Sequence, residues 1–231
     1  MEILSIQVGQ PKSYGVADAE DPLERPWVSA IDKQPVRGRV WLGAEGLAGD
    51  TQADRRHHGG PDMAVLVYAA EHYPRWREEL ADPGLAHGAF GENITLDGAD
   101  EDTVCIGDVF AVGDALVEVS QPRQPCQTLA RKFRVRDMVE RVLQRQAFGW
   151  YLRVRHDGWL EQGMVFQLQN RPYPQWTVKE VERIMRRRAH EPEAARRLAE
   201  CVALADGWRA RLGEGGAATG ASSGRQGDYY P

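Results

Sequence analysis

Residues 107–119, GDVFAVGDALVEV, decide the fold class of this 231-residue chain. Two Gly-Asp pairs, Gly107-Asp108 and Gly113-Asp114, each precede a short run of apolar or alternating residues. Such runs, separated by tight polar turns, are typical of antiparallel strands joined as hairpins. We therefore predict strands over residues 109–112 and 115–119.

The same pattern recurs along the first 170 residues. Because a regular alternation of strands and helices is absent, we predict a mostly β fold, an antiparallel barrel or sandwich, and not a doubly wound parallel sheet. Apolar residues at helical spacing predict two helical insertions, over residues 69–80 and 127–146, whose apolar stripes we interpret as core. The remaining predicted strands are 2–8, 36–42, 64–68, 92–96, 149–154 and 165–169.

After Arg171-Pro172 the pattern changes to helices only. Thr177 and Glu180 form a capping box, and Pro192 is well placed to begin a second helix. We predict a barrel domain over residues 1–170, a small three-helix domain over 171–212, and a disordered, glycine-rich tail over 213–231. We interpret the arginine run at 186–188 as a solvated helix face, although a nucleic-acid or electron-donor contact remains the alternative.

Charge and composition exclude several classes of protein. The net charge is −5, with residues 1–170 at −8 and residues 171–231 at +3. An acidic balance argues against a binder of nucleic acid polymers. No run approaches the about 20 apolar residues that span a bilayer, and the N-terminus does not resemble a signal peptide. We expect a cytoplasmic protein that does not bind a membrane, and three widely spaced cysteines suit a reducing compartment.

Cys126 is the cysteine most suited to chemistry. It lies in the segment Gln121-Pro122-Arg123-Gln124-Pro125-Cys126, after a predicted strand and directly before a predicted helix. A helix start and a nearby arginine lower the pKa of a thiol, so Cys126 could act as a nucleophile or as a soft metal ligand. A buried small side chain is the alternative, and it is our interpretation of Cys105 and Cys201.

The polar, glycine-rich segment 46–61 is a second candidate. It carries Asp50, Asp54, two arginines and two histidines, and it ends with Gly59-Gly60-Pro61. Glycines allow a close approach of the main chain, and paired arginines suit an anionic phosphate. A structural turn is an equal alternative. A zinc site is less consistent, because adjacent histidines point apart and no second ligand cluster follows.

Several motifs follow one another in a fixed order and together resemble a known family. They are Lys33-Gln34-Pro35-Val36, Gly49-Asp50-Thr51-Gln52-Ala53-Asp54 with His58-Gly59-Gly60, Phe90-Gly91-Glu92-Asn93, Gln121 to Cys126, Gly149-Trp150-Tyr151, and Arg171-Pro172 before the helical end. This series resembles the MOSC family, domains named after the C-terminal part of molybdenum cofactor sulfurases. The likeness spans about residues 2–212 and is greatest to the bacterial YiiM-like branch, which adds three helices. One departure, Gly163-Met164 in place of Gly-Asp, affects a turn.

The resemblance implies a MOSC-type β-barrel that binds the molybdenum cofactor, with Cys126 as the ligand of the metal. It further implies a reductase of N-hydroxylated bases and related compounds, of which 6-N-hydroxylaminopurine is the representative substrate. On this basis we predict that Cys126, His58 and Asp54 act in catalysis, the last two through hydrogen bonds to the pterin edge or through proton delivery. The residues that we expect to bind the cofactor are Lys33, Asp50, Gly59, Gly60, Gly91, Asn93 and Arg123.

Two other functions remain open from the sequence. A carrier would bind the molybdenum cofactor or sulfur without turning over a substrate, and a cysteine hydrolase would pair Cys126 with His58. A cofactor-loaded reductase would also need a small-molecule N-hydroxylated substrate and an external electron donor. A homodimer is an expectation by analogy, since barrels of this kind leave apolar edges.

Overall fold

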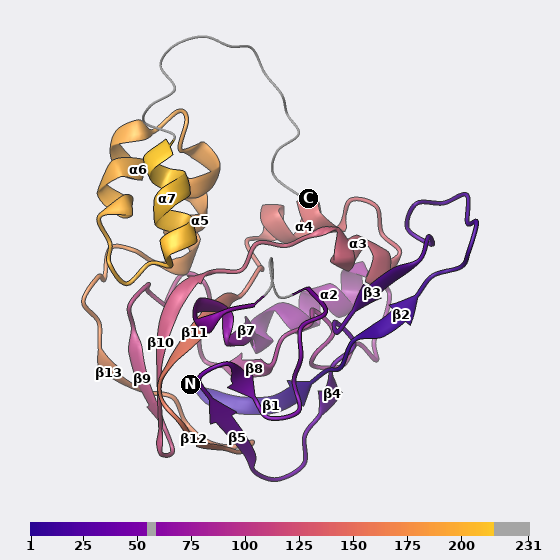
Figure 1. The fold of residues 1–231 in the computed structure, drawn as a ribbon, viewed down its shortest axis with the longest axis horizontal. Helices are drawn as coiled ribbons and strands as arrows, with labels where there is room; N and C mark the ends of the chain where they lie inside the picture. Colours follow the sequence, from indigo (N-terminus) through magenta and orange to yellow (C-terminus); the bar gives the residue numbers. More distant parts are fainter. Residues whose placement is uncertain (55–58, 215–231) are drawn as a thin grey trace.

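A curved sheet of eight strands carries most of the fold (Figure 1). The computed structural model describes residues 1–54 and 59–214. Neighbouring strands of this sheet are antiparallel, except for the parallel pair β7 and β8. In spatial order the strands are β13 (Gln167–Asn170), β9 (Val109–Val112), β10 (Ala115–Pro122), β11 (Trp150–His156), β7 (Val65–Ala69), β8 (Ile94–Asp97), β1 (Glu2–Val8) and β4 (Gln34–Pro35).

The sheet curls so that the segment before its edge strand β13 reaches β1, the strand next to the opposite edge. The segment 163–166, which leads into β13, is hydrogen-bonded to the start of β1. The Ile3 amide donates to the Met164 carbonyl at 2.9 Å, and the Phe166 amide donates to the Met1 carbonyl at 3.0 Å. The mostly β, barrel-like fold expected from the sequence is therefore confirmed.

The β9–β10 hairpin follows the predicted alternation. Val117 pairs with Phe110, and Val112 pairs with Ala115 across the turn at Gly113, whose φ is +56°. The side chains of Phe110, Val112 and Val117 are at most 2% exposed. Each buried side chain of this size contributes about 1.5–3 kcal/mol relative to exposure, which fixes the register of the hairpin. β10 continues three residues beyond its predicted end, to Pro122.

Two smaller sheets were not predicted as they occur. Only the segment at β5 was expected to be a strand, and it begins four residues later than predicted. The other strands have two or three residues, too few to show a periodic pattern. One sheet has the order β12 (Gly158–Leu160), β5 (Val40–Gly43) and β6 (Gly46–Leu47), and the other pairs β2 (Lys12–Tyr14) with β3 (Trp27–Ser29).

The helical insertions lie where the apolar spacing predicted them, with one correction. The single helix expected over residues 127–146 is two helices, because Arg134 adopts a left-handed main-chain conformation with φ +55° and ends the first. The short helices η1, η2 and α2 flank β7 in sequence. The bounds are η1 (Pro61–Met63), η2 (Ala70–His72), α2 (Tyr73–Glu79), α3 (Gln127–Phe133) and α4 (Met138–Arg145).

Three helices follow the barrel and pack beside the upper end of β10 and β11 (Figure 1). The predicted cap is confirmed, since the Thr177 hydroxyl accepts a hydrogen bond from the Glu180 amide at 3.1 Å. Trp208 and Leu212 are at most 2% exposed and fill the interior of this unit. The helices are α5 (Val178–Arg187), α6 (Pro192–Ala199) and α7 (Asp206–Glu214).

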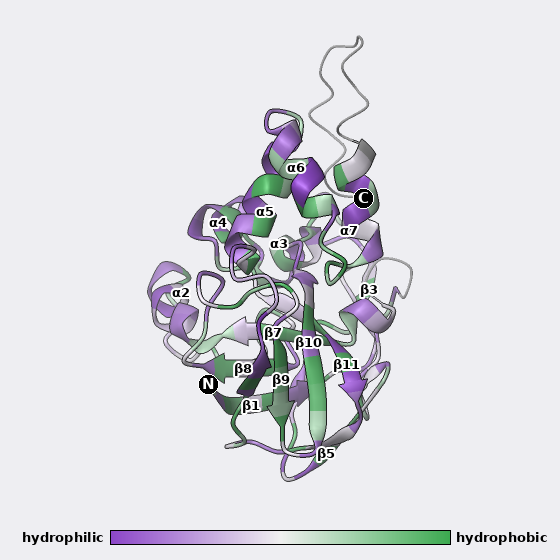
Figure 2. Cartoon of the chain, turned by 90° about the vertical axis from the view of Figure 1, so that its left-hand side faces the viewer, coloured by the Kyte–Doolittle hydropathy of each residue, from purple (hydrophilic) through white to green (hydrophobic). Residues whose placement is uncertain are grey.

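The boundary between barrel and helices contains an ion pair whose carboxylate is buried and whose arginine is partly exposed. Arg171 donates to both carboxylate oxygens of Asp108, at 2.8 and 2.6 Å, and Asp108 is fully buried. Figure 2 shows hydrophobic residues along β1, β8 and β9, beneath which the core is formed. Gly213 and Glu214, expected in the tail, belong to α7, and residues 215–231 lie outside the described residues. No helix in the described part of the chain is long and apolar enough to cross a membrane.

Candidate functional site

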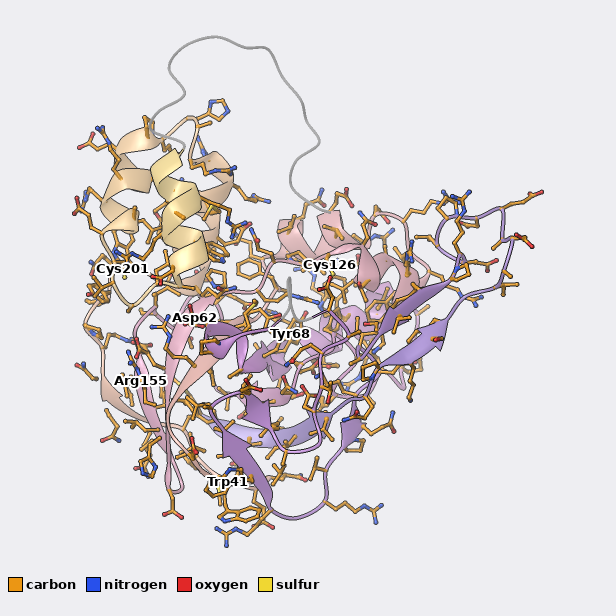
Figure 3. The ribbon with its side chains drawn as sticks, viewed as in Figure 1. Trp41, Asp62, Tyr68, Cys126, Arg155 and Cys201 are labelled. Carbon is orange, nitrogen blue, oxygen red and sulfur yellow. The ribbon has the colours of Figure 1, made fainter. Side chains whose placement is uncertain are left out.

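Cys126 lies where β10 passes into α3 (Figure 3). It is the residue before the first helical residue, with extended main-chain angles of φ −127° and ψ 172°, and its carbonyl accepts the Leu129 amide at 3.0 Å. The thiol is half-buried, whereas Cys105 and Cys201 are each 2% exposed and burial raises the pKa of both. Cys126 is therefore the accessible cysteine of the three.

Arg123 is a buried cation three residues before Cys126. It is 6% exposed, its amide donates to the Gly149 carbonyl at 3.0 Å, and its Nη2 donates to the Phe90 carbonyl at 3.3 Å. Nη1 is buried and has no hydrogen-bond partner among residues 1–54 and 59–214. A buried charged donor left unpaired costs free energy, so this guanidinium edge is suited to an anionic or carbonyl group of a ligand.

Tyr151 connects the motifs electrostatically. It lies on β11 opposite Gln121 of β10, next to the turn that carries Arg123 and Cys126. Burial raises the pKa of Tyr151 to about 12; the charge of Arg123 opposes this rise, and the charges of Cys126 and Asp50 add to it. Asp50, Arg123, Cys126 and Tyr151, called the site cluster below, thus come together from three distant segments of the chain.

Lys33 and Asp50, both expected at the cofactor, form a buried ion pair. Lys33 Nζ lies 2.5 Å from Asp50 Oδ1, and the two side chains are 8% and 3% exposed. The same carboxylate oxygen accepts the Gly9 amide at 2.7 Å. Burial lowers the pKa of Lys33, although the charge and hydrogen bond of Asp50 act in the opposite direction. Asp50 therefore ties the loop after β6 to the end of β1 and holds Lys33 beside the site cluster.

Lys132 is a further, partly buried cation, which the sequence reasoning did not single out. Its Nζ donates to the Ile31 carbonyl at 3.2 Å and lies 3.2 Å from Asp32. Burial lowers its pKa, and the charge of Lys33 acts in the same direction, so the two lysines lie near one another. The only sequence signal for Lys132 is its place on the helix that follows Cys126. Tyr151 was part of a quoted motif but had no predicted role.

The motif Phe90-Gly91-Glu92-Asn93 is a hydrogen-bonded segment that contacts Arg123 of the site cluster through the Phe90 carbonyl. Glu92 is fully buried and accepts hydrogen bonds from Tyr73, Thr95 and two main-chain amides, at 2.5–3.1 Å. Gly91 has φ +81°, and a Cβ at this position would lie 2.9 Å from Ile31 Cγ1. A larger residue would therefore displace the turn that precedes Lys33.

The side chain of Asn93 forms hydrogen bonds with the main chain of two strands. Its Oδ1 accepts the Leu66 amide at 3.1 Å, and its Nδ2 donates to the Gln7 carbonyl at 3.3 Å. These contacts join β1 to β7 and give Asn93 a structural role in the described structure. Contact of Gly91 or Asn93 with a cofactor stays a prediction.

The segment 46–61 is only partly described. Asp54 is exposed at the last described position before the gap, and His58 lies outside the described residues. Gly59 is half-buried, and the exposed Gly60, with φ +101°, directly precedes η1 and has open space where a Cβ would be. Their proposed roles therefore stay predictions. Within the described ranges no group of three or more His, Cys, Asp or Glu side chains could hold a metal ion.

Two family descriptions match the chain in succession. Residues 54–167 match the MOSC domain, and residues 176–213 match the YiiM-like, 3-alpha helix domain. The chain is 42% identical over 210 residues to the Bacillus subtilis protein YflK, covering 90% of this chain and 91% of YflK. It is 40% identical over 179 residues to a protein of Gibberella moniliformis named reductase, covering 76% of this chain and 31% of that longer protein.

The fold is also similar to that of a solved structure. The crystal structure of YiiM from Geobacillus stearothermophilus aligns with a TM-score of 0.77 at 34% identity. The alignment covers 93% of this chain and 98% of that one, so it includes both the barrel and the three helices.

Proposed function

The chain belongs to the MOSC domain family, in the branch with a YiiM-like three-helix domain, and from this premise we propose that it binds the molybdenum cofactor and reduces N-hydroxylated compounds. MOSC domains are associated with binding of this cofactor, and one relative is named a reductase. The proposed substrates are small N-hydroxylated bases and related compounds, such as 6-N-hydroxylaminopurine. An external donor would supply the electrons.

One observation carries the proposal: Arg123, whose buried Nη1 has no hydrogen-bond partner among the described residues, lies three residues before the half-buried Cys126. The molybdenum cofactor is a pterin dithiolene that carries molybdenum and a terminal phosphate. A thiolate is the soft ligand that such a metal prefers, and a desolvated arginine suits an anion or a pterin carbonyl. Cys126 and Arg123 offer these two groups from one turn, and Arg123 Nη1 lacks a partner among the described residues, so the residues present fit the cofactor.

The cofactor, when bound, supplies the two-electron chemistry by which an N–OH group, two electrons and two protons become an N–H group and water. The chain's residues would bind and orient. Cys126 would ligate the metal, and Arg123 and Lys33 would hold the anionic part, Lys33 while retaining its ion pair with Asp50. Tyr151 stays protonated at neutral pH because its pKa is raised to about 12, so its hydroxyl can donate a hydrogen bond. Asp54 and His58 remain our candidates for proton delivery.

Metal and pterin analysis tests the cofactor first. We expect near-stoichiometric molybdenum and pterin in protein purified from a host that makes the cofactor. Cys126→Ser should lose molybdenum and activity, whereas the matched variant Cys201→Ala should keep both, because Cys201 lies between α6 and α7 and not in the turn that carries Cys126. Metal-free wild-type protein without pterin fluorescence would contradict the proposal.

Turnover tests the reaction separately. With a chemical electron donor, the loaded protein should convert 6-N-hydroxylaminopurine to adenine. Retention of molybdenum and pterin without turnover across N-hydroxylated bases would favour the alternative, a carrier of the cofactor.

A further inference from the structure

The helical domain contacts the turn that carries Cys126. Arg211 of α7 donates from Nη1 to Gln124 Oε1 at 3.0 Å, across 87 residues of sequence. We propose that Arg211 is a positioning residue, which holds the Gln124-Pro125-Cys126 turn in place through Gln124. This role goes beyond the proposed function and rests on it only in that Cys126 is the proposed metal ligand. It makes the helical domain a structural part of the site.

The turn needs an external support because it lies between two regular elements. The amide of Arg123 donates to the carbonyl of Gly149, directly before β11, and the first bond within α3 is accepted by the Cys126 carbonyl. Pro125 has no amide hydrogen to donate. The side chain of Gln124 is therefore a group through which the helical domain can restrain this segment.

Arg211 is itself held in place. Its guanidinium lies 5.4 Å from the centroid of the Trp208 ring, one turn earlier on α7, and Trp208 is 2% exposed. Stacking on a buried aromatic ring restricts the long side chain, so less entropy is lost when it binds Gln124. The pair is thus a preorganised donor and not a mobile surface arginine.

The start of α7 is fixed to the same strand that ends in the turn. The Ala205 amide, directly before α7, donates to the Ser120 carbonyl of β10 at 3.0 Å. The ion pair of Arg171 with Asp108 anchors the beginning of the helical domain to the barrel. Because α7 contacts the chain at both Ser120 and Gln124, a displacement of the helix would move the turn before Cys126.

The reactivity of the Cys126 thiol in the apoprotein provides the test. Cys105 and Cys201 are buried, so reaction of the native protein with a disulfide reagent reports on Cys126. A half-buried thiol in a restrained turn reacts through local opening. Removal of one hydrogen bond from a charged donor, weakened by partial exposure, should speed the reaction about fivefold in both Arg211→Ala and Gln124→Ala.

Coupling and rescue separate positioning from a general loss of stability. The double variant should react no faster than either single one, because both remove the same contact. Arg211→Lys, which keeps a cationic donor, should restore most of the slow reaction, and Arg197→Ala, at an exposed position of α6, should match the wild type. Hydrogen exchange over residues 121–128 should rise in the same variants.

Three results would overturn the proposal. One is an unchanged thiol rate in Arg211→Ala, and another is a double variant whose rate is the product of the two single effects. The third is Arg211→Lys behaving as Arg211→Ala. If Arg211→Ala does not fold, Gln124→Ala decides, since it breaks the contact from the barrel side. These measurements use cofactor-free protein, so failure to find molybdenum or turnover would contradict the proposed function and leave this proposal standing.

Discussion

Glu182 is a buried carboxyl group on α5, and its titration should make the stability of the protein depend on pH. Its side chain is 8% exposed, and the nearest described cation, Arg186, has its Nε 3.4 Å from Glu182 Oε2. Burial raises the pKa of Glu182 from 4.5 to about 7, and the charge of Arg186 lowers it only in part. The group therefore resists ionisation in the folded protein.

The raised pKa fixes the sign and size of the effect. Below pH 4.5 Glu182 is protonated in both the folded and the unfolded chain, so it contributes no pH dependence. Between pH 4.5 and 7 the unfolded chain ionises while the folded one keeps its proton, so the free energy of unfolding falls as pH rises. Above pH 7 the full penalty is present. A rise of the Glu182 pKa from 4.5 to about 7, at about 1.36 kcal/mol per pH unit, corresponds to about 3 kcal/mol.

Glu182→Gln removes the charge at every pH and nearly preserves shape. We expect the variant to be about 3 kcal/mol more stable than the wild type at pH 8 and equal to it at pH 4, measured by urea unfolding at both values. Glu200→Gln, at an exposed position after α6, should differ little from the wild type at either pH. Two results would show that Glu182 is not a strained, buried acid. The Glu182→Gln variant could be no more stable than the wild type at pH 8, or its gain in the free energy of unfolding could be the same at both pH values.

Two further substitutions test buried polar contacts through the free energy of unfolding. Arg171→Met should cost about 3 kcal/mol, because it leaves the fully buried carboxylate of Asp108 without its ion pair, whereas Arg196→Met on the exposed face of α6 should be nearly neutral; equal effects would contradict the assignment. Tyr73→Phe should cost about 2 kcal/mol by removing the 2.5 Å hydrogen bond to the buried Glu92, and a neutral result would mean that the other three donors to Glu92 suffice.

The strands that were predicted well are those whose side chains sort cleanly between core and surface. In β9 the buried Phe110 and Val112 alternate with half-buried neighbours, so its bounds match the prediction. β4 and β6 have two residues each and were not predicted, because two residues cannot show a period. Their existence depends on partners elsewhere in the chain.

The break between α3 and α4 shows a different limit. Apolar residues continue at helical spacing from Leu129 and Phe133 to Val139, so the pattern predicts one helix. Arg134 nevertheless takes the left-handed conformation, and its amide bonds to the Ala130 carbonyl to end α3. The left-handed residue that ends this helix is an arginine, whereas glycine or asparagine usually takes that position, so the sequence carries no signal for the break.

Some residues of the candidate site could be identified from their local sequence, and others only from contacts between distant segments. Cys126 and Arg123 could be chosen from the sequence because prolines, a strand end and a helix start surround them. The proximity of Tyr151 depends on its pairing with Gln121, and that of Arg211 on the docking of α7. Contacts between segments so far apart leave no spacing signal in a single sequence.

The polar residues of the motifs either stabilise the fold or are left to bind a ligand, and their hydrogen bonds show which role each has. Glu92 and Asn93 use their side chains on the chain itself, and Asp50 binds both Lys33 and the Gly9 amide. Substituting these residues should therefore lower stability whether or not a cofactor is present. Arg123 differs, since one buried nitrogen has no partner in the described part of the chain, and a bound ligand would supply one. Its contribution to stability should accordingly increase when the cofactor binds, because binding to the folded state alone stabilises that state.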